Sequence, residues 1–379
     1  MIKKVFPILA LCMFSSMLGV GIITPLLPLY VQSMGTTGVW LGMIFAAFST
    51  SYMITAPFIG RLSDRRGRKL FLSIGLLFYS ITSLGFIWAV NVHQLSLVRL
   101  AQGVAGAMIT PVAQAYIGDV CPEGDEGKWM GYANAAFVSG FGFGPLIGGT
   151  LTEHFGMNVA FYSMGGLNLL AFLIATLFLP EVNRQKTEQS LHPSFTEISQ
   201  SSMVRGLFSI RLVQSVGRGG MMTFLPIFAV TYLSLSTSLI GILIAINFLL
   251  QSLLAPLGGR IADRFSRRSL IVIGSTISLM SLAAIPSAQN LGQLLVLSFT
   301  LGIGGAISTP VVTALAVEEG RKYGMGSTMA GLTLAMSLGM IIGPISAGVI
   351  ADVINIDAVF FFVAGAILTG TGLFIRFTR

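Results

Sequence analysis

Long apolar segments, separated by short polar ones, follow one another from end to end of this chain. Each apolar segment is about 20 residues long, the length of helix that crosses the hydrocarbon core of a bilayer. Backbone groups in lipid must form hydrogen bonds within their own segment, so runs this long and this continuously apolar predict helices. The twelve predicted spans lie near residues 6–30, 39–60, 70–90, 94–117, 129–151, 159–180, 206–231, 238–258, 269–287, 292–316, 325–350 and 357–376. The pattern therefore predicts an all-α membrane protein with twelve transmembrane helices.

A second regularity runs through these spans, because residues of the same kind recur at a constant offset of 199 positions. The matching pairs are Asp64 and Asp263, Arg68 and Arg267, Thr110-Pro111 and Thr309-Pro310, Gly140 and Gly339, and Gly144-Pro145 and Gly343-Pro344. This period is far too long for a solenoid repeat, and each copy holds several spans, as in transporters built from two related bundles. We therefore expect two pseudo-symmetric six-helix bundles, 1–181 and 206–379, joined by a polar cytoplasmic linker at 182–205.

Composition and charge agree with a membrane protein. Of the 379 residues, 54% are hydrophobic and 9% are charged, against about 25% charged in soluble domains. Outside the spans, Lys and Arg occur only at the termini and in the even-numbered loops, so the positive-inside rule predicts cytoplasmic termini in a multi-pass protein of the cell inner membrane. This topology accounts for the net charge of +8, and we expect no nucleic-acid partner. The first fifteen residues have no small-residue cleavage site, so they are expected to form the first span and not a removed signal.

Two cytoplasmic loops, at residues 60–69 and 259–268, hold acids inside basic clusters. In each loop a glycine is expected to end a helix, an acid follows, and an arginine comes four residues after the acid. A second acid follows the fourth and the tenth span. The residues are Gly60, Asp64, Arg68 and Asp119 in the first half and Asp263, Arg267 and Glu318 in the second. We predict two charge chains that form a conformational latch on the cytoplasmic side. The alternative is a basic loop that only sets the topology.

The first of these loops resembles the signature of the major facilitator superfamily, G-x-L-a-D-r-x-G-r-k between the second and third helices. The second loop departs from this form at Ser266, where the signature has glycine. Three further stretches resemble the twelve-helix drug:proton antiporter branch, which contains multidrug efflux proteins. They are Leu18-Gly19 with Pro25 to Pro28, then Arg99, Gln102, Gly103 and Gly106, and then Gly140, Gly144, Pro145, Gly148 and Gly149. The resemblance implies the fold of this superfamily and outward transport by antiport.

The glycines of the fifth span recur every four residues at Gly140, Gly144 and Gly148, so they form a stripe that another helix can approach closely. Pro145 adds a bend because it lacks a backbone donor. Helix packing alone accounts for this stripe. The resemblance implies a second role, at an interface between the two bundles.

Arg99 lies several residues inside the fourth span, where a charged side chain normally faces protein or water and serves a function. Snorkelling of this side chain to the outer headgroups is the alternative. The match of Gln102 and Gly103 to the antiporter pattern favours a function in proton coupling.

Arg218 is expected near the middle of the membrane, on the same face of the seventh span as Arg211 and Gln214. The resemblance implies that spans one, four, seven and ten line a central cavity, so we predict that Arg218 is a charge in that cavity; a structural arginine is the alternative. All 14 carboxylates are expected in loops or at helix ends, which favours neutral or anionic amphipathic cargo. Further cavity candidates, each also explained by ordinary packing, are Gln114, Tyr116, Asn134, Asn168, Asn247, Gln251, Met108, Met221, Met222 and Phe224.

These observations predict a secondary active transporter that exports hydrophobic or amphipathic small molecules by alternating access, with proton-coupled antiport as its energy source. A metabolite or sugar carrier, working as a uniporter for neutral or anionic solutes, is the second hypothesis. A membrane enzyme is disfavoured because the sequence shows no paired cavity carboxylates, metal-ligand spacing or Ser/His/Asp set. A receptor that does not transport is a further alternative. We expect a small-molecule substrate and the lipid bilayer as partners, a monomer, and no metal ion or cofactor besides the proton gradient.

Overall fold

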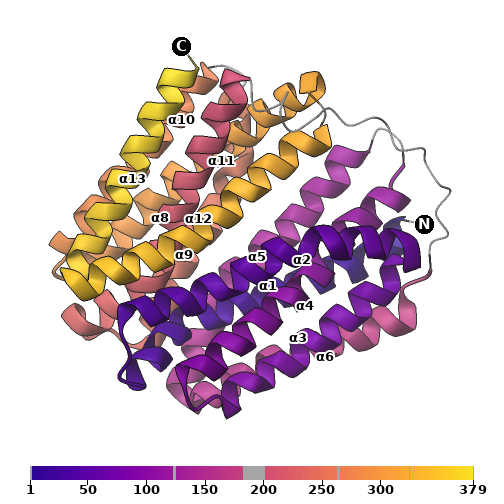
Figure 1. Cartoon of the computed structure of the whole chain (residues 1–379), viewed down its shortest axis with the longest axis horizontal. Helices are drawn as coiled ribbons and strands as arrows, with labels where there is room; N and C mark the ends of the chain where they lie inside the picture. The colour runs from indigo at the N-terminus through magenta and orange to yellow at the C-terminus, as the bar shows by residue number, and fades with distance from the viewer. Residues whose placement is uncertain (1, 123–124, 182–200, 263–264, 324, 379) are drawn as a thin grey trace. The chain divides into compact units, whose positions relative to one another are not determined.

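The structure, a computed structural model, describes residues 2–122, 125–181, 201–262, 265–323 and 325–378. Within these ranges, twelve helices are long and apolar enough to cross a membrane (Figure 1). They are α1 (Ile2–Ser33), α2 (Gly38–Arg66), α3 (Arg68–Trp88), α4 (Val92–Val120), α5 (Glu126–Phe155), α6 (Met157–Phe178), α8 (Ser202–Leu233), α9 (Thr237–Ala262), α10 (Arg267–Ala284), α11 (Leu291–Tyr323), α12 (Met325–Val353) and α13 (Ile356–Phe377). A short 3-10 helix, η1 (Ile285–Ser287), follows α10. The prediction of an all-α protein with twelve spans is confirmed.

Several helices continue past their apolar span into polar sequence. Gly60 was expected to end a helix, but this is wrong, because α2 continues to Arg66. The break between α2 and α3 is Gly67, whose φ of 98° lies in a region that only glycine adopts without strain. In the same way α4 continues to Val120, so Asp119 lies in its last turn. Hydropathy marks the part of a helix that lies in lipid, and the helix itself ends where the backbone turns.

The chain forms two compact units. Unit 1 comprises Met1–Thr36, Ala47–Lys186 and Leu235–Ala245, and unit 2 comprises Thr37–Ala46, Thr187–Ser234 and Ile246–Arg379. Each unit therefore consists mainly of one half of the sequence and also contains the first turns of one helix, α9 or α2, from the other half. The boundaries drawn from the sequence, with bundles at 1–181 and 206–379, stay a prediction.

In unit 1, α5 packs directly on α1 through its glycine stripe. A Cβ atom built at Gly140, Gly144 or Gly148 would lie 2.4, 2.5 or 2.6 Å from the nearest backbone atom of α1. These distances are shorter than real Cβ contacts, so the two backbones can approach this closely only because the side chains are missing. The stripe therefore holds α1 and α5 together inside one unit.

Unit 2 repeats this arrangement between α8 and α12. A Cβ atom at Gly339 or Gly343 would lie 2.4 or 2.5 Å from a backbone oxygen of α8. A cluster of apolar side chains from α8, α10, α11 and α13 fills the interior of the unit on the side where α8 begins. Its buried members are Leu207, Ile210, Leu270, Ile271, Val311, Val312, Leu315, Ala316 and Phe374. The two halves thus use the same small residues for the same helix contact.

Candidate transport site

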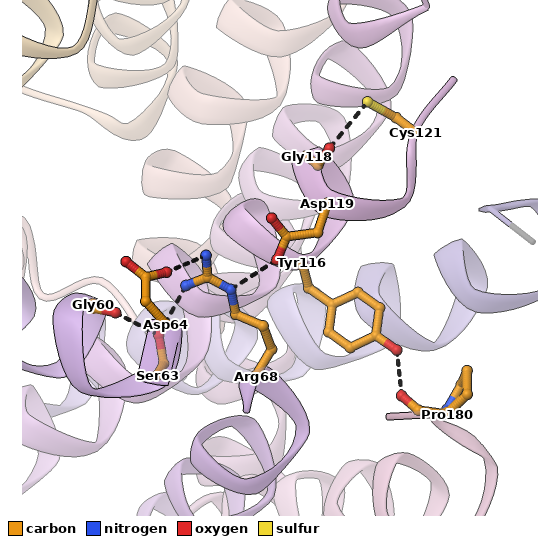
Figure 2. A network of polar contacts seen from close by, with 9 residues as sticks. All are labelled: Gly60, Ser63, Asp64, Arg68, Tyr116, Gly118, Asp119, Cys121 and Pro180. Carbon is orange, nitrogen blue, oxygen red and sulfur yellow. Dashed lines mark hydrogen bonds and ion pairs between the residues drawn. The ribbon is translucent and has the colours of Figure 1, made fainter. Parts of the chain in front are cut away.

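An ion-pair network joins the ends of α2, α3 and α4 (Figure 2). Arg68, the first residue of α3, forms an ion pair with Asp64 from the last turn of α2. Its Nε atom donates a hydrogen bond of 3.0 Å to Oδ2 of Asp119, in the last turn of α4. Its Nη1 atom donates to the hydroxyl of Ser63 at 2.9 Å, and this hydroxyl in turn donates to the carbonyl oxygen of Gly60 at 2.8 Å. The structure therefore brings together the four residues that the sequence singled out in the first half.

Burial within this network is uneven, which decides how strongly each contact acts. Arg68 is buried, and the Asp119 side chain is 14% exposed, whereas the Asp64 side chain is 42% exposed. A buried ion pair is costly to break because the remaining charge loses its counter-charge away from water. An exposed pair contributes little, because water replaces it. The pair with Asp119 is therefore expected to contribute more to stability than the pair with Asp64.

The end of α4 is also tied to the end of α6. The hydroxyl of Tyr116 donates to the carbonyl oxygen of Pro180, two residues after the end of α6, as Figure 2 shows. Tyr116, expected to face a cavity, is buried and makes this contact instead. The three helices that meet at Arg68 and Asp119 are thereby connected to the segment that follows α6.

The corresponding network of the second half is more open. Nη1 of Arg267 lies 2.8 Å from Oε1 of Glu318, and the two side chains are 31% and 52% exposed. Asp263 lies outside the described residues. The next acid along α11, Glu319, is buried and accepts hydrogen bonds from the hydroxyl of Ser201 at 3.1 Å and from Nζ of Lys322 at 2.8 Å. The repeat therefore conserves the arginine and acid types but not their burial.

In the interior of unit 1, Arg99 on α4 is buried against α2. Its guanidinium donates to Oε1 of Gln102 at 2.9 Å and lies 4.8 Å from the centroid of the Phe48 ring, a cation–π contact. A Cβ atom at Gly103 would lie 2.1 Å from the hydroxyl of Ser51, so this glycine allows α2 to approach. A side chain that snorkelled to lipid headgroups would be exposed, whereas Arg99 is 3% exposed. The burial favours the interpretation that Arg99 has a function inside the protein.

Unit 2 contains a cavity of about 490 Å³, counting its opening. Its polar side chains come from α8, α9, α10 and α11, and its apolar ones from α8, α10, α11 and α13. The residues that line it are Gln214, Gly217, Arg218, Met221, Asn247, Gln251, Ser278, Leu282, Leu301, Gly305, Ser308, Thr309 and Ile367. Five of the residues proposed from the sequence therefore share one cavity: Gln214, Arg218, Met221, Asn247 and Gln251.

Other sequence candidates lie elsewhere. Gln114 and Asn168 belong to α4 and α6 of unit 1, and Asn168 donates to backbone oxygens of Met164 and Ser15. Phe224 is fully buried in α8. Among the residues that line the cavity there is no Asp, Glu or His. Over the described part of the chain, no group of three or more His, Cys, Asp or Glu side chains has the geometry to hold a metal ion.

Two acids that the sequence reasoning missed cap helices from the opposite half of the chain. In unit 2, the carboxylate of Asp352 accepts hydrogen bonds from the backbone N–H groups of Gly38 at 2.6 Å and Val39 at 2.9 Å, at the start of α2. In unit 1, Oε2 of Glu153 accepts from the N–H group of Ser238 at 2.9 Å, at the start of α9. Carboxylates at helix N-termini satisfy free donors and the helix dipole.

Glycines allow the same two helix starts to pack closely. A Cβ atom at Gly42 of α2 would lie 2.2 Å from the carbonyl oxygen of Pro344, and one at Gly241 of α9 would lie 2.2 Å from that of Pro145. Gly149 and Gly348 face the first residues of α9 and α2 in the same way. The constant offset of 199 relates Glu153 to Asp352 and Gly42 to Gly241. The offset therefore marks these residues as repeated pairs in the sequence, but it does not indicate which helices they contact.

Sequence comparison adds relatives that cover the whole chain. A profile described as Major Facilitator Superfamily matches residues 9–210 and 207–379. An uncharacterized MFS-type transporter of Methanocaldococcus jannaschii is 30% identical over 384 residues, which is 100% of this chain and 99% of that protein. The quinolone resistance protein NorA of Staphylococcus aureus is 30% identical over 377 residues, which is 97% of this chain and 95% of that protein.

Solved structures share the fold. A bacterial homologue of the human lysosomal transporter Spinster, in an inward-facing and unoccupied conformation, has a TM-score of 0.81 at 16% identity, covering 99% of this chain and 95% of its own. The nucleoside transporter NupG has a TM-score of 0.83 at 15% identity, with 99% and 100% covered. The human organic anion transporter MFSD10 has a TM-score of 0.71 at 18% identity, with 98% and 99% covered. At these identities the similarity concerns the fold alone.

Proposed function

Because the chain belongs to the major facilitator superfamily of membrane transporters, we propose that it exports hydrophobic or amphipathic small molecules by alternating access. The observation that carries this proposal is the cavity of unit 2, where an apolar wall and a few polar groups share one space. Met221, Leu282 and Ile367 provide the apolar wall, and Arg218 and Gln251 are among the polar groups. Sites for drug-sized molecules combine a mostly apolar lining with a small number of placed polar groups. The likeness to NorA, named for quinolone resistance, supports cargo of this kind.

Alternating access requires contacts that form in one state and break in another. We propose that the network around Arg68, on the cytoplasmic side, supplies one such set. In it Asp64 is the acid that changes partners, and the buried pair of Arg68 with Asp119 stays in place. The exposure of Asp64 supports this division of roles. The corresponding positions in the second half belong to Arg267 and Glu318, and to Asp263, which lies outside the described residues.

We propose that export is driven by protons and that Arg99 and Gln102 take part in the coupling. Their buried hydrogen bond supports this, because a guanidinium in the interior responds strongly to any nearby change of charge. The cavity lining of unit 2 includes no acid, so the proton would be carried elsewhere, for example at an acid near a helix end such as Asp119. The termini are proposed to be cytoplasmic and the working unit to be the monomer.

A carrier for neutral or anionic metabolites, working without a gradient, is the second candidate. The specific observation that favours it is the set of amide and hydroxyl groups around Arg218, which suits a polar solute as well as an amphipathic one. The two candidates differ in their response to a proton gradient, which a reconstituted system measures directly.

The test uses the purified chain in proteoliposomes with a fluorescent quinolone and an imposed pH gradient. Export by antiport predicts that the pH gradient drives the quinolone against its own concentration gradient and that a proton ionophore abolishes this accumulation. Protein-free liposomes with the same gradient give the passive background. Equilibration that ignores the gradient would favour the uniporter. If neither quinolones nor polar solutes cross faster than in protein-free liposomes, the transport proposal fails.

A further inference from the structure

The cavity of unit 2 contains a guanidinium with more donors than the protein satisfies. Arg218 lies near the middle of α8, a helix that spans Ser202 to Leu233. Its contacts within the described residues are one hydrogen bond of 3.4 Å from Nη2 to Oε1 of Gln251 and the Phe248 ring, whose centroid is 5.6 Å away. A guanidinium offers five N–H donors, and no described carboxylate lies within ion-pair distance of this one. Most of the hydrogen-bonding capacity of Arg218 is therefore available to a ligand.

A second arginine adds to the positive charge of this region. Arg211 lies seven residues before Arg218 on the same helix, and its Nη2 atom donates a hydrogen bond of 3.4 Å to the sulfur of Met336. Two guanidinium groups with no described carboxylate within ion-pair distance are costly inside a membrane protein. An anion in the cavity would provide the missing counter-charge. The cavity thus favours anions and disfavours cations by charge alone.

Gln214, one helical turn before Arg218, supplies an acceptor of known orientation. The hydroxyl of Ser308 donates its proton to the carbonyl oxygen of Gly304 at 3.0 Å, so its oxygen must accept from Nε2 of Gln214, 3.2 Å away. This fixes which end of the amide faces Ser308 and leaves Oε1 of Gln214 as the free acceptor. That oxygen is buried and has no hydrogen-bond partner in the part of the chain that the structure describes. A ligand with an N–H or O–H group beside its anionic group would satisfy it.

The other walls of the cavity define the rest of the ligand. Met221, Leu282, Leu301 and Ile367 are apolar and contribute to the same lining. Gly305 keeps room for the amide that faces Arg218, because a Cβ atom there would lie 2.0 Å from Nε2 of Gln251. An apolar body, an anionic group and a neighbouring donor are therefore accommodated together.

We propose that this cavity is the substrate site of the transporter and that it selects amphipathic monoanions with a hydrogen-bond donor next to the anionic group. Arg218 is the counter-charge, held by Gln251, and Gln214 accepts from the donor after a small rotation of its amide toward the ligand. The side chains of Met221 and Ile367 contact the apolar body. This assignment deepens the proposed transport function and rests on it, but its binding step is measurable without transport.

The experiment measures binding by titration calorimetry to the full chain in lipid nanodiscs, with nanodiscs free of protein as the blank. The probes are N-decanoylglycine, which has a carboxylate beside an amide N–H group, decanoate, which lacks the donor, and decanamide, which lacks the charge. We expect N-decanoylglycine to bind roughly tenfold more tightly than decanoate, the factor that one hydrogen bond contributes. Decanamide should bind more weakly than either acid.

Variants then separate the two contacts. Arg218→Gln should weaken binding of both acids at least about tenfold and leave decanamide unchanged, as expected for the loss of a charged partner. Gln214→Leu should remove the advantage of N-decanoylglycine over decanoate while both still bind. Gly305→Ala should weaken both acids because it displaces Gln251. Arg205→Gln is the matched control, because it removes the same charge from the first turn of α8, outside the cavity.

The outcomes are distinguishable. The anion site is refuted if Arg218→Gln binds the acids as the parent does, or if decanamide or decyltrimethylammonium binds as tightly as N-decanoylglycine. If N-acetylglycine binds as tightly as N-decanoylglycine, the apolar body contributes nothing and the amphipathic class is wrong. If Arg218→Gln does not fold, Gln214→Leu and Gly305→Ala still test whether the acids bind in this cavity. Binding of the acids without transport in proteoliposomes would support this site and overturn the proposed function. Quinolone transport without binding of the acids would support the proposed function and overturn this site.

Discussion

Replacing Asp119 by asparagine should destabilise the protein far more than the same change at Asp64, although both acids contact Arg68. The structure sets the difference through burial. Asp119 and Arg68 are both largely buried and joined by a hydrogen bond of 3.0 Å, whereas nearly half of the Asp64 side chain is exposed. Asp119→Asn leaves a buried guanidinium with a neutral partner, and Asp64→Asn changes a contact that water can replace.

The magnitudes follow from these environments. Breaking a fully buried ion pair costs about 3–5 kcal/mol. Arg68 keeps Asp64 and Ser63 as partners, and asparagine can still accept a hydrogen bond, so we expect about 2 kcal/mol for Asp119→Asn. For Asp64→Asn we expect about 0.5 kcal/mol, the range of an exposed pair. Glu318, at the equivalent position of the second half, is 52% exposed, so Glu318→Gln should also cost about 0.5 kcal/mol and serves as the matched control.

The assay is thermal unfolding of the purified chain in detergent, with the three variants and the parent compared side by side. A double-mutant cycle of Asp119→Asn with Arg68→Gln then isolates the energy of that pair. Asp64→Asn should instead alter the transport rate and the inward/outward balance in proteoliposomes, because this acid is the proposed moving partner. Equal destabilisation by Asp119→Asn and Glu318→Gln, or a coupling energy near zero, would show that burial does not govern this network.

Four further variants, one of them with a matched control, test other contacts. Gly144→Ala places a methyl group against the backbone of α1 and should cost about 1–3 kcal/mol, seen as a lower unfolding temperature. Gly166→Ala is the control, because its added Cβ atom would meet no neighbouring described helix, and it should not lower the unfolding temperature, since alanine is the better helix former. Glu153→Gln and Asp352→Asn should each lower the unfolding temperature through the loss of a charged helix cap, and unchanged unfolding temperatures would disprove the capping role. Gln102→Leu removes an acceptor from buried Arg99 and should reduce proton-driven uptake while binding of N-decanoylglycine stays the same; normal coupling in this variant would exclude Gln102 from the coupling step.

Some of the site could be predicted because the relevant signals are local or repeated. Asp64 and Arg68 are four residues apart in a basic cluster, and Asp119 and Glu318 share the offset of the duplication, so their pairing with arginines could be inferred from spacing. The end of α2 could not, because the apolar span stops near residue 60 while the helix continues to Arg66. A helix end depends on where the backbone leaves helical geometry, here at Gly67, and hydropathy does not report this.

The residues that line the cavity could likewise be predicted from the sequence only in part. Arg218 and Gln251 could be nominated one by one as polar residues in apolar spans, but their contact across α8 and α9 depends on the rotation of both helices. Gln114 was nominated on the same grounds and lies in the other unit. A polar side chain in a predicted span indicates that the residue is buried in the protein. Which residue it contacts depends on how the helices pack.

The amino-acid sequence by itself determined the number of spans, the duplication and the membership of the family, because hydrophobic length and repeated residue types are properties of the chain read in one dimension. Only the tertiary structure decided which glycines bring backbones together, that Glu153 and Asp352 cap helices from the opposite half, and that Gln214, Arg218 and Gln251 share a cavity. These contacts join segments far apart in the chain, and their geometry depends on the rotation and depth of each packed helix, which no linear pattern specifies.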